Sequence, residues 1–446
     1  MEWMDFSAFG DKTSVIDGER VYTYNDLSNA LLELHNTLIT AITPGEVVAI
    51  LSDYSFESVA LFLALMHNRN IIVPITTTIE SEIDEKLSES HVDKAIRIEG
   101  GKYRILERHE TKQHPMIETL RSRNHSGLVL FSSGSTGKPK AMIHDLDTLA
   151  QSYNGKKPKS MNLLLFLMFD HIGGLNTLLN ILSMGSTMVI PSSRNVEEIC
   201  HLIEKYAIAV LPASPTFLNL MMIADAPHRF DLSSLRMITY GTEAMSDSLL
   251  ERLKPAFPRV KFLQTFGTSE TGIATTSSLS SNSTFMKIDD PDLEYRIVEG
   301  ELWLRSHTQI LGYLNASMES FTEDGWFKTG DLVEEGDNGY LRIVGRSKEV
   351  INVGGEKVLP IEVESVLMQM SQIDDVLIYA MPNAITGQSV AAEVVLHNAE
   401  DTEGIKKTIR QFCKDKLDSY KIPTHVKVVD RTNFSERFKK MRLGHQ

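Results

Sequence analysis

A segment rich in glycine and hydroxyl residues, between residues 128 and 140, has the composition of a phosphate-binding loop. It reads LVLFSSGSTGKPK, so an apolar strand runs directly into small residues and two lysines. Glycines let backbone N–H groups turn toward an anion, hydroxyls add donors, and lysines add positive charge. We therefore predict that polyphosphate is bound by Ser132, Ser133, Gly134, Ser135, Thr136, Gly137, Lys138 and Lys140.

The spacing of this loop differs from that of a Walker A motif. Two residues rather than four separate Gly134 from Gly137, and Pro139 follows the lysine. The spacing therefore disfavours a kinase-type phosphotransferase, which would form ADP. The structural alternative is a plain Gly/Ser turn.

Two further segments place a carboxylate among small polar residues. In QTFGTSETG (264–272), Glu270 beside hydroxyls suits a hard cation that bridges phosphates. The alternative there is the start of a capped helix. In WFKTGDL (326–332), Asp331 is an acceptor suited to a diol, and the alternative is a β-turn at Thr-Gly-Asp.

These segments, taken together and in order, resemble the motifs of the adenylate-forming enzymes, which include acyl- and aryl-CoA synthetases, peptide-synthetase adenylation domains and luciferases. The resemblance runs from YTYNDLSNALLELHNTL near the start to FKKMR near the end. It implies that Phe266, with Gly267, lies against adenine, that Ser269 contacts the α-phosphate and that Glu270 binds Mg²⁺. Phe266 and Ser269 stand where the family usually has Tyr and Thr.

The resemblance implies roles for residues in several other segments. YGTEAM (240–245) matches a segment that lines the adenine and acyl pockets, and FDHIGG (169–174) matches one with a histidine beside the carboxylate site. The implied contacts are, in chain order, His171 at the acyl site, Gly241, Thr242 and Glu243 at the adenine and acyl pockets, Asp331 and Arg346 at the ribose, and Gly354 and Gly355 at the thiol channel. Lys348 matches the hinge position.

The family's adenylation lysine lies near the C-terminus in the pattern P-R-T-x-x-G-K-x-x-R. The text here is NFSERFKKMR, which aligns Lys439 with the lysine and Arg442 with the arginine. Asn433, Phe434 and Phe438 replace the usual Pro, Arg and Gly. Lys440 is the competing candidate for the role, and a basic amphipathic tail is the structural alternative.

The order of the segments predicts an α/β protein. Helix-like residues 56–66 precede the β-branched run 70–75, and helix-like residues 197–206 precede IAVLPA, followed by Ser214 as N-cap and a first-turn proline. Buried strands joined by helices favour a parallel sheet. Beyond about residue 300, ELWLRS and YLRIVG read as antiparallel strands.

We expect two domains: a large N-terminal one over 1–346, of parallel and mixed sheets with flanking helices and a β-rich subdomain, and a small, mobile α+β lid over 347–446. The hinge is expected near Lys348.

Composition excludes several classes of protein. The 446 residues carry a net charge of −14, which argues against a nucleic-acid binder. The 405–446 segment nevertheless has 12 Lys/Arg against 4 Asp/Glu, which suits a cationic lid over triphosphate or simply a solvated basic face. The longest apolar run, Val59 to Met66, is too short for a membrane span, and no secretory signal is evident. Two cysteines favour a reducing, cytoplasmic compartment.

The resemblance therefore implies a ligase that uses ATP, Mg²⁺ and CoA. It would convert a small carboxylic acid to acyl-AMP with release of pyrophosphate, and then to acyl-CoA and AMP. Two alternatives are a ligase that loads the phosphopantetheine of a carrier protein, and an inactive nucleotide-binding homologue, for which the altered C-terminal motif is the reason. The identity of the acid and the oligomeric state are not legible in the residues.

Overall fold

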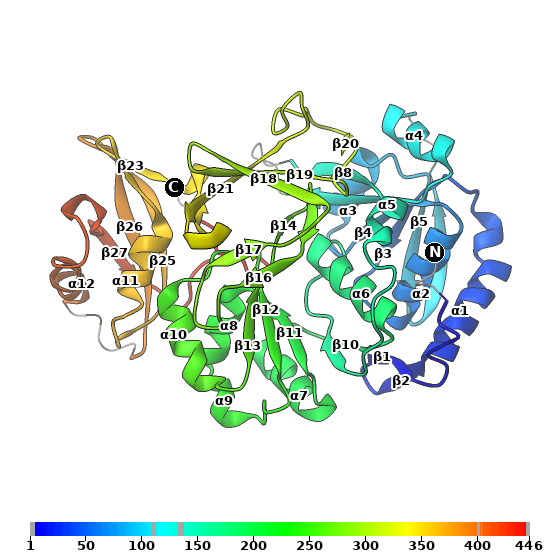
Figure 1. The fold of residues 1–446 in the computed structure, drawn as a ribbon, viewed down its shortest axis with the longest axis horizontal. Coiled ribbons are helices and arrows are strands. Elements are labelled where there is room, and N and C mark those ends of the chain that lie inside the picture. Colours follow the sequence, from blue (N-terminus) through cyan, green and yellow to red (C-terminus); the bar gives the residue numbers. More distant parts are fainter. Residues whose placement is uncertain (1–4, 109–112, 133–137, 399–401, 403, 443–446) are drawn as a thin grey trace.

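The computed structural model describes residues 5–108, 113–132, 138–398, 402 and 404–442. Within them the strands form four large sheets and one two-stranded hairpin. Figure 1 shows the blue and cyan N-terminal elements at one end of the molecule and the orange and red C-terminal elements at the other. None of the described helices is both long enough and apolar enough to cross a bilayer.

The first large sheet is parallel except at its edge, where β1 and β2 are antiparallel. Its strands are, in spatial order, β13 (Lys261–Gln264), β12 (Met237–Tyr240), β11 (Val210–Ala213), β9 (Asn162–Leu164), β10 (Thr187–Ile190), β1 (Thr13–Asp17) and β2 (Arg20–Thr23). The parallel sheet predicted from the 197–223 region is therefore confirmed. Ser214 caps α8 (Pro215–Ile223) as predicted, because its side chain accepts from the backbone N–H of Phe217.

The second large sheet is parallel at its centre and antiparallel at both edges. Its strands are, in spatial order, β20 (Gly312–Tyr313), β8 (Lys140–Asp145), β7 (Gly127–Ser132), β4 (Ile71–Ile75), β3 (Val47–Leu51), β5 (Lys94–Glu99) and β6 (Lys102–Glu107). This sheet brings the strand after the phosphate loop beside Tyr313.

Helices lie between consecutive strands of the two sheets and pack on them. α2 (Phe56–His67) is buried along nearly its whole length, which explains the uninterrupted apolar run in its sequence. The helices of this part are α1 (Tyr24–Asn36), α2 (Phe56–His67), α3 (Glu80–Glu89), α4 (Pro115–Arg123), α5 (Leu146–Gln151), α6 (Ile172–Met184), α7 (Val196–Tyr206), α8 (Pro215–Ile223), α9 (Ala226–Arg229) and α10 (Asp247–Ala256), with a 3₁₀ turn at Ile39–Ala41.

The third large sheet is antiparallel and follows the first two in the chain. Its strands are, in spatial order, β16 (Thr276–Ser278), β17 (Met286–Ile288), β22 (Leu341–Arg346), β21 (Phe327–Glu335), β19 (Glu301–Ser306) and β18 (Leu293–Val298). The hairpin of β14 (Phe266–Thr268) and β15 (Gly272–Ala274) precedes it. The helix start considered at Thr268–Glu270 is thus wrong, because Gly272, at φ +83°, turns the chain into β15.

Residues from Ile351 onward form the C-terminal region, with a sheet and a hydrophobic core of its own. The sheet contains β24 (Glu356–Val358), β23 (Ile351–Val353), β26 (Gly387–Leu396), β25 (Ile373–Asn383) and β27 (His425–Val428). Helices α11 (Pro360–Leu367) and α12 (Ile405–Cys413) contribute to this core. Short 3₁₀ turns lie at Asp337–Gly339, Ser347–Glu349 and Ser419–Lys421. We call residues 5–346 the N-terminal region.

Candidate active site

A cleft lies where the C-terminal region meets the N-terminal region. Eight of the sequence-predicted residues line it: Gly241, Thr242, Glu243, Phe266, Gly267, Asp331, Arg346 and Lys439. They come from segments up to about 200 residues apart in the chain. The fold therefore brings these eight predicted residues together in one place.

Asp331 and Arg346 form the acidic and basic pair of this cleft. They face each other across neighbouring strands β21 and β22, and Arg346 Nε donates to Asp331 Oδ1 at 2.9 Å. Burial raises the pKa of Asp331, while the positive charges of Arg346 and Lys439 oppose that rise. Asp331 lies inside a strand, so the separate β-turn considered for Thr-Gly-Asp is not formed.

Close backbone approach explains two glycines of the cleft. A Cβ on Gly241 would lie 2.6 Å from Thr265 Oγ1, and a Cβ on Gly267 would lie 2.4 Å from the Gly272 carbonyl oxygen. Any side chain at these positions would push apart the strand ends that form the cleft wall.

Gln264 is a residue of the cleft wall to which the sequence reasoning gave no role. Its Oε1 is buried and has no hydrogen-bond partner within the described residues. An unpaired buried acceptor costs free energy unless a ligand supplies a donor. The signal was present in the sequence, because Gln264 opens the QTFGTSETG segment.

Glu270 lies at the turn between β14 and β15, next to the exit of the phosphate loop. Tyr313 Oη donates to Glu270 Oε1 at 3.1 Å, and Lys140 Nζ lies 5.1 Å from the centre of the Tyr313 ring. Burial raises the pKa of Glu270, and the hydrogen bond from Tyr313 opposes the rise. A cation bound here would favour the ionised carboxylate. Tyr313 is a second residue that sequence reasoning missed.

The side-chain amide of Asn315 fixes the C-terminal end of the phosphate loop. Asn315 accepts from the backbone N–H of Ala141 and donates to the Pro139 carbonyl, both at 2.9 Å. Ser132 ends β7, and Lys138 is exposed. The remaining predicted residues of the loop, Ser133, Gly134, Ser135, Thr136 and Gly137, lie outside the described residues.

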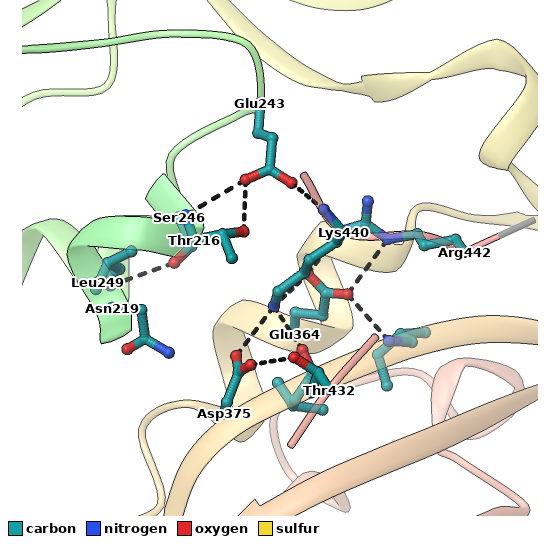
Figure 2. A network of polar contacts seen from close by, with 12 residues as sticks. Thr216, Asn219, Glu243, Ser246, Leu249, Glu364, Asp375, Thr432, Lys440 and Arg442 are labelled. Atoms are coloured by element: carbon teal, nitrogen blue, oxygen red, sulfur yellow. Dashed lines mark hydrogen bonds and ion pairs between the residues drawn. The ribbon is translucent and has the colours of Figure 1, made fainter. Parts of the chain in front are cut away.

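The two adjacent lysines of the C-terminal segment, residues 433–442, have different surroundings. Lys440 Nζ lies 3.2 Å from Asp375 and 3.6 Å from Glu364, and it donates to the Val376 carbonyl. Lys439 lines the cleft, and its pKa is lowered by burial and then by Arg346. Figure 2 shows that the Lys440 side chain points away from Glu243 and into the C-terminal region.

Three acidic residues, Glu349, Glu364 and Asp375, hold Arg442 and Thr432 in place. Arg442 pairs with Glu364 at 2.8 Å and with Glu349 at 3.1 Å, and Thr432 donates to Asp375 (Figure 2). Of the described basic residues after 405, only Lys439, Lys440 and Arg442 line the cleft. Others form ion pairs elsewhere, such as Lys421 with Glu362.

His171 caps helix α6, where its Nδ1 accepts from the backbone N–H of Gly173 at 3.0 Å. An accepting Nδ1 carries no proton, so the ring is neutral. Burial, together with the positive charges of Arg437 and Lys439, lowers the pKa of His171 to about 3. The histidine therefore lies near the C-terminal segment, and it is outside the set of residues that line the cleft.

Gly354 and Gly355 form the turn between β23 and β24, at φ +61° and +98°. The N–H of Gly354 donates to the Thr386 carbonyl at 2.9 Å. Neither glycine lines the cleft in this conformation.

Solved structures share the fold over nearly the whole chain. An anthranilate CoA ligase bound to anthranoyl-AMP is 20% identical, with a TM-score of 0.82 and coverage of 98% of this chain and 95% of that one. An o-succinylbenzoate CoA synthetase of Bacillus subtilis, bound to its acyl-adenylate, is 21% identical with a TM-score of 0.77 and coverage of 99% and 97%.

Curated relatives are similar over part of their length. A probable CoA ligase of Humulus lupulus is 29% identical over 67% of this chain and 59% of its own length. The 4-coumarate–CoA ligase 1 of Arabidopsis thaliana is 29% identical over 65% of this chain and 57% of its own length. The matched part is thus less than two thirds of either relative.

Family models account for most of the chain. The AMP-binding enzyme model matches residues 4–314, and the model of the AMP-binding enzyme C-terminal domain matches residues 362–439. The two matches follow one another along the chain in the expected order, and the chain belongs to the AMP-binding enzyme family.

Proposed function

We propose that this protein is an AMP-forming acid–thiol ligase. A carboxylate oxygen of the substrate forms a bond to the α-phosphorus of ATP, and the bond to pyrophosphate breaks. The sulfur of CoA then forms a bond to the acyl carbon, the thiol loses its proton, and AMP leaves. Relatives named as CoA ligases support this reaction.

The observation that carries the proposal is the position of Lys439. Lys439 lines the cleft beside the Asp331–Arg346 pair, although it comes from a segment much later in the chain. A cation fixed in a cleft of low dielectric stabilises charge that develops on phosphate and pyrophosphate oxygens. We assign the adenylation role to Lys439 because the ammonium group of Lys440 is already paired with two carboxylates.

The other residues are assigned by their chemistry. Asp331 would accept from the ribose hydroxyls, with Arg346 beside it, and Gln264 Oε1 would accept from the amino group of adenine. Phe266, Gly241, Thr242 and Glu243 would form the walls around the base.

Glu270 fits a Mg²⁺ ion that arrives with ATP. Mg²⁺ is usually held by one or two carboxylates, with substrate phosphates and waters completing its shell. No group of three or more Asp, Glu, His or Cys that could hold a metal occurs within the described ranges. The ion would neutralise phosphate charge, and Tyr313 would hold the Glu270 carboxylate in place.

The second half-reaction calls for another arrangement of the C-terminal region. We propose that residues 347–446 turn about a hinge near Lys348, which is exposed between β22 and β23. Gly354 and Gly355 would then approach the thiol. Cys200 and Cys413 are both free and buried, which supports our proposal of a reducing, cytoplasmic setting.

Product analysis tests the proposal. The protein would be incubated with ATP, Mg²⁺ and a pool of aliphatic and aromatic acids that includes 4-coumarate and anthranilate, with and without CoA. We expect AMP and pyrophosphate that depend on the acid, and acyl-CoA only when CoA is present. Acyl-adenylate without acyl-CoA would favour a carrier-protein acceptor. ADP, or no acid-dependent AMP, would contradict the proposal.

A further inference from the structure

The residues on both sides of Lys439 are attached to the N-terminal region. Arg437 Nη2 lies 3.1 Å from Asp170 Oδ2, and the backbone N–H of Lys440 donates to Glu243 Oε1 at 2.5 Å. Glu243 in turn accepts from the hydroxyl of Thr216 at 2.6 Å (Figure 2). Lys439 is thus held between two polar contacts that link the regions.

A third contact is aromatic and lies between these two. The ring of Phe438 meets Phe217 edge-on, with centroids 5.1 Å apart at 74°, and lies 5.6 Å from Phe166. Phe166 and Phe217 are fully buried in the core of the N-terminal region, 4.5 Å from each other. Such edge-to-face pairs are favourable beyond the area they bury. The C-terminal segment therefore packs one half-buried aromatic side chain against the core of the N-terminal region.

The backbone of Phe438 makes this contact unusual. Its φ is +51°, in the left-handed region that residues with a Cβ seldom adopt. The family motif that this segment resembles has glycine at the position, which accepts such a φ without strain. Phenylalanine here is strained, and strain of this kind persists only where the surroundings compensate for it. Within the segment, Phe434 stacks on Phe438 with ring centroids 5.8 Å apart, and the Phe438 N–H donates to the Ser435 carbonyl at 2.8 Å. The contact with Phe166 and Phe217 is the compensation that comes from the N-terminal region.

We propose that Phe438 is a positioning residue, an aromatic anchor that seats the C-terminal segment on the N-terminal region so that Lys439 enters the cleft. The proposal rests on the proposed function for its effect on catalysis. The contact of Phe438 with Phe166 and Phe217 must break whenever the C-terminal region moves away from the N-terminal region. It therefore favours adenylation and opposes the thioester step.

Phe438→Gly tests the anchor without adding backbone strain, because glycine tolerates the observed φ. We expect the acid-dependent ATP–pyrophosphate exchange rate to fall at least tenfold. Thioester formation from added acyl-adenylate should stay unchanged or become faster. Phe438→Leu, which refills the seat, should retain at least a third of the exchange rate. Phe412→Ala, in α12, removes a ring elsewhere in the C-terminal region and serves as the control.

Hydrogen exchange measured by mass spectrometry gives a readout that does not depend on activity. In Phe438→Gly, amides of residues 433–442 should exchange at least tenfold faster than in the wild type, while β25 and β26 keep their protection. Phe438→Ala provides a second variant for the same measurement. If the wild type has no activity, this result still stands or fails separately from the proposed function. Unchanged exchange at 433–442, or equal loss in both half-reactions, would overturn the proposal.

Discussion

Replacing each of the two adjacent lysines by methionine should give opposite results. Lys439→Met removes a cation that lines the cleft and that burial already disfavours, as its lowered pKa indicates. Adenylation should fall by about 10² to 10³, the usual loss when one group that stabilises transition-state charge is removed. The free energy of unfolding should stay within about 1 kcal/mol of the wild type or rise, because no buried partner is left unpaired.

Lys440→Met should instead destabilise the C-terminal region. The side chains of Lys440, Glu364 and Asp375 are 14%, 6% and 8% exposed, so their charges are largely removed from water. Breaking a buried ion pair from one side costs about 3–5 kcal/mol. We expect the lower end, about 3 kcal/mol, because Glu364 keeps Arg442 at 2.8 Å and Asp375 keeps the Thr432 hydroxyl.

Native-state hydrogen exchange in β25 and β26 measures this loss locally. A change of about 3 kcal/mol corresponds to exchange that is roughly a hundredfold faster where global opening of the region controls it. Pyrophosphate exchange and thioester formation from added acyl-adenylate are then assayed at a temperature where both variants remain folded. Greater destabilisation by Lys439→Met, or a larger specific loss of adenylation in Lys440→Met, would refute the assignment.

Three further predictions concern the cleft. As the pH rises, the adenylation rate should decline with a midpoint below the ordinary lysine pKa, because the lowered pKa of Lys439 means that its ammonium form is lost earlier. The thioester step from added acyl-adenylate should not share this decline. A midpoint common to both steps would contradict the role of Lys439. Asp331→Ala should raise the KM for ATP about 10- to 100-fold through loss of a charge-assisted hydrogen bond of about 1.5–3 kcal/mol, and a normal KM would refute the ribose contact. Gln264→Met should weaken ATP binding about tenfold with little change in unfolding free energy, since Gln264 Oε1 has no partner among the described residues. Titration calorimetry measures the binding and thermal melting measures the stability. A large loss of stability with unchanged binding would contradict the adenine contact.

The sequence predicted those helices and caps that depend only on residues close together in the chain. The apolar run in α2 and the Ser214 cap of α8 are confirmed, because continuous burial and capping are legible over a few residues. The turn at Thr268–Glu270 was ambiguous for the same reason. Thr268 Oγ1 accepts from the N–H of Thr271 as a helix cap would, but Gly272 then reverses the chain into a hairpin.

Contacts between distant segments could not be predicted from one sequence. Nothing in the local text links Glu270 to Tyr313, which lies 43 residues later, or Lys440 to Asp375. The motif alignment left both lysines open, and only the packing of the C-terminal segment on Glu364 and Asp375 distinguishes them. The basic composition of 405–446 likewise did not show which of its residues lie at the cleft, and most of the described ones do not.

The position of Arg346 has a consequence for how ligand and conformation communicate. It is the last residue of β22, it is paired in register with Asp331, and the 3₁₀ turn of Ser347–Glu349 that leads into the C-terminal region begins at the next residue. A nucleotide that binds at Asp331 would thus contact the Asp331–Arg346 pair, the cross-strand pair of β21 and β22 nearest the proposed hinge. If nucleotide binding shifts the equilibrium between two orientations of the C-terminal region by some factor, thermodynamic reciprocity requires the nucleotide affinities of those orientations to differ by the same factor. On this arrangement, a single coupling free energy governs both the release of AMP and the return of the C-terminal region to its first orientation.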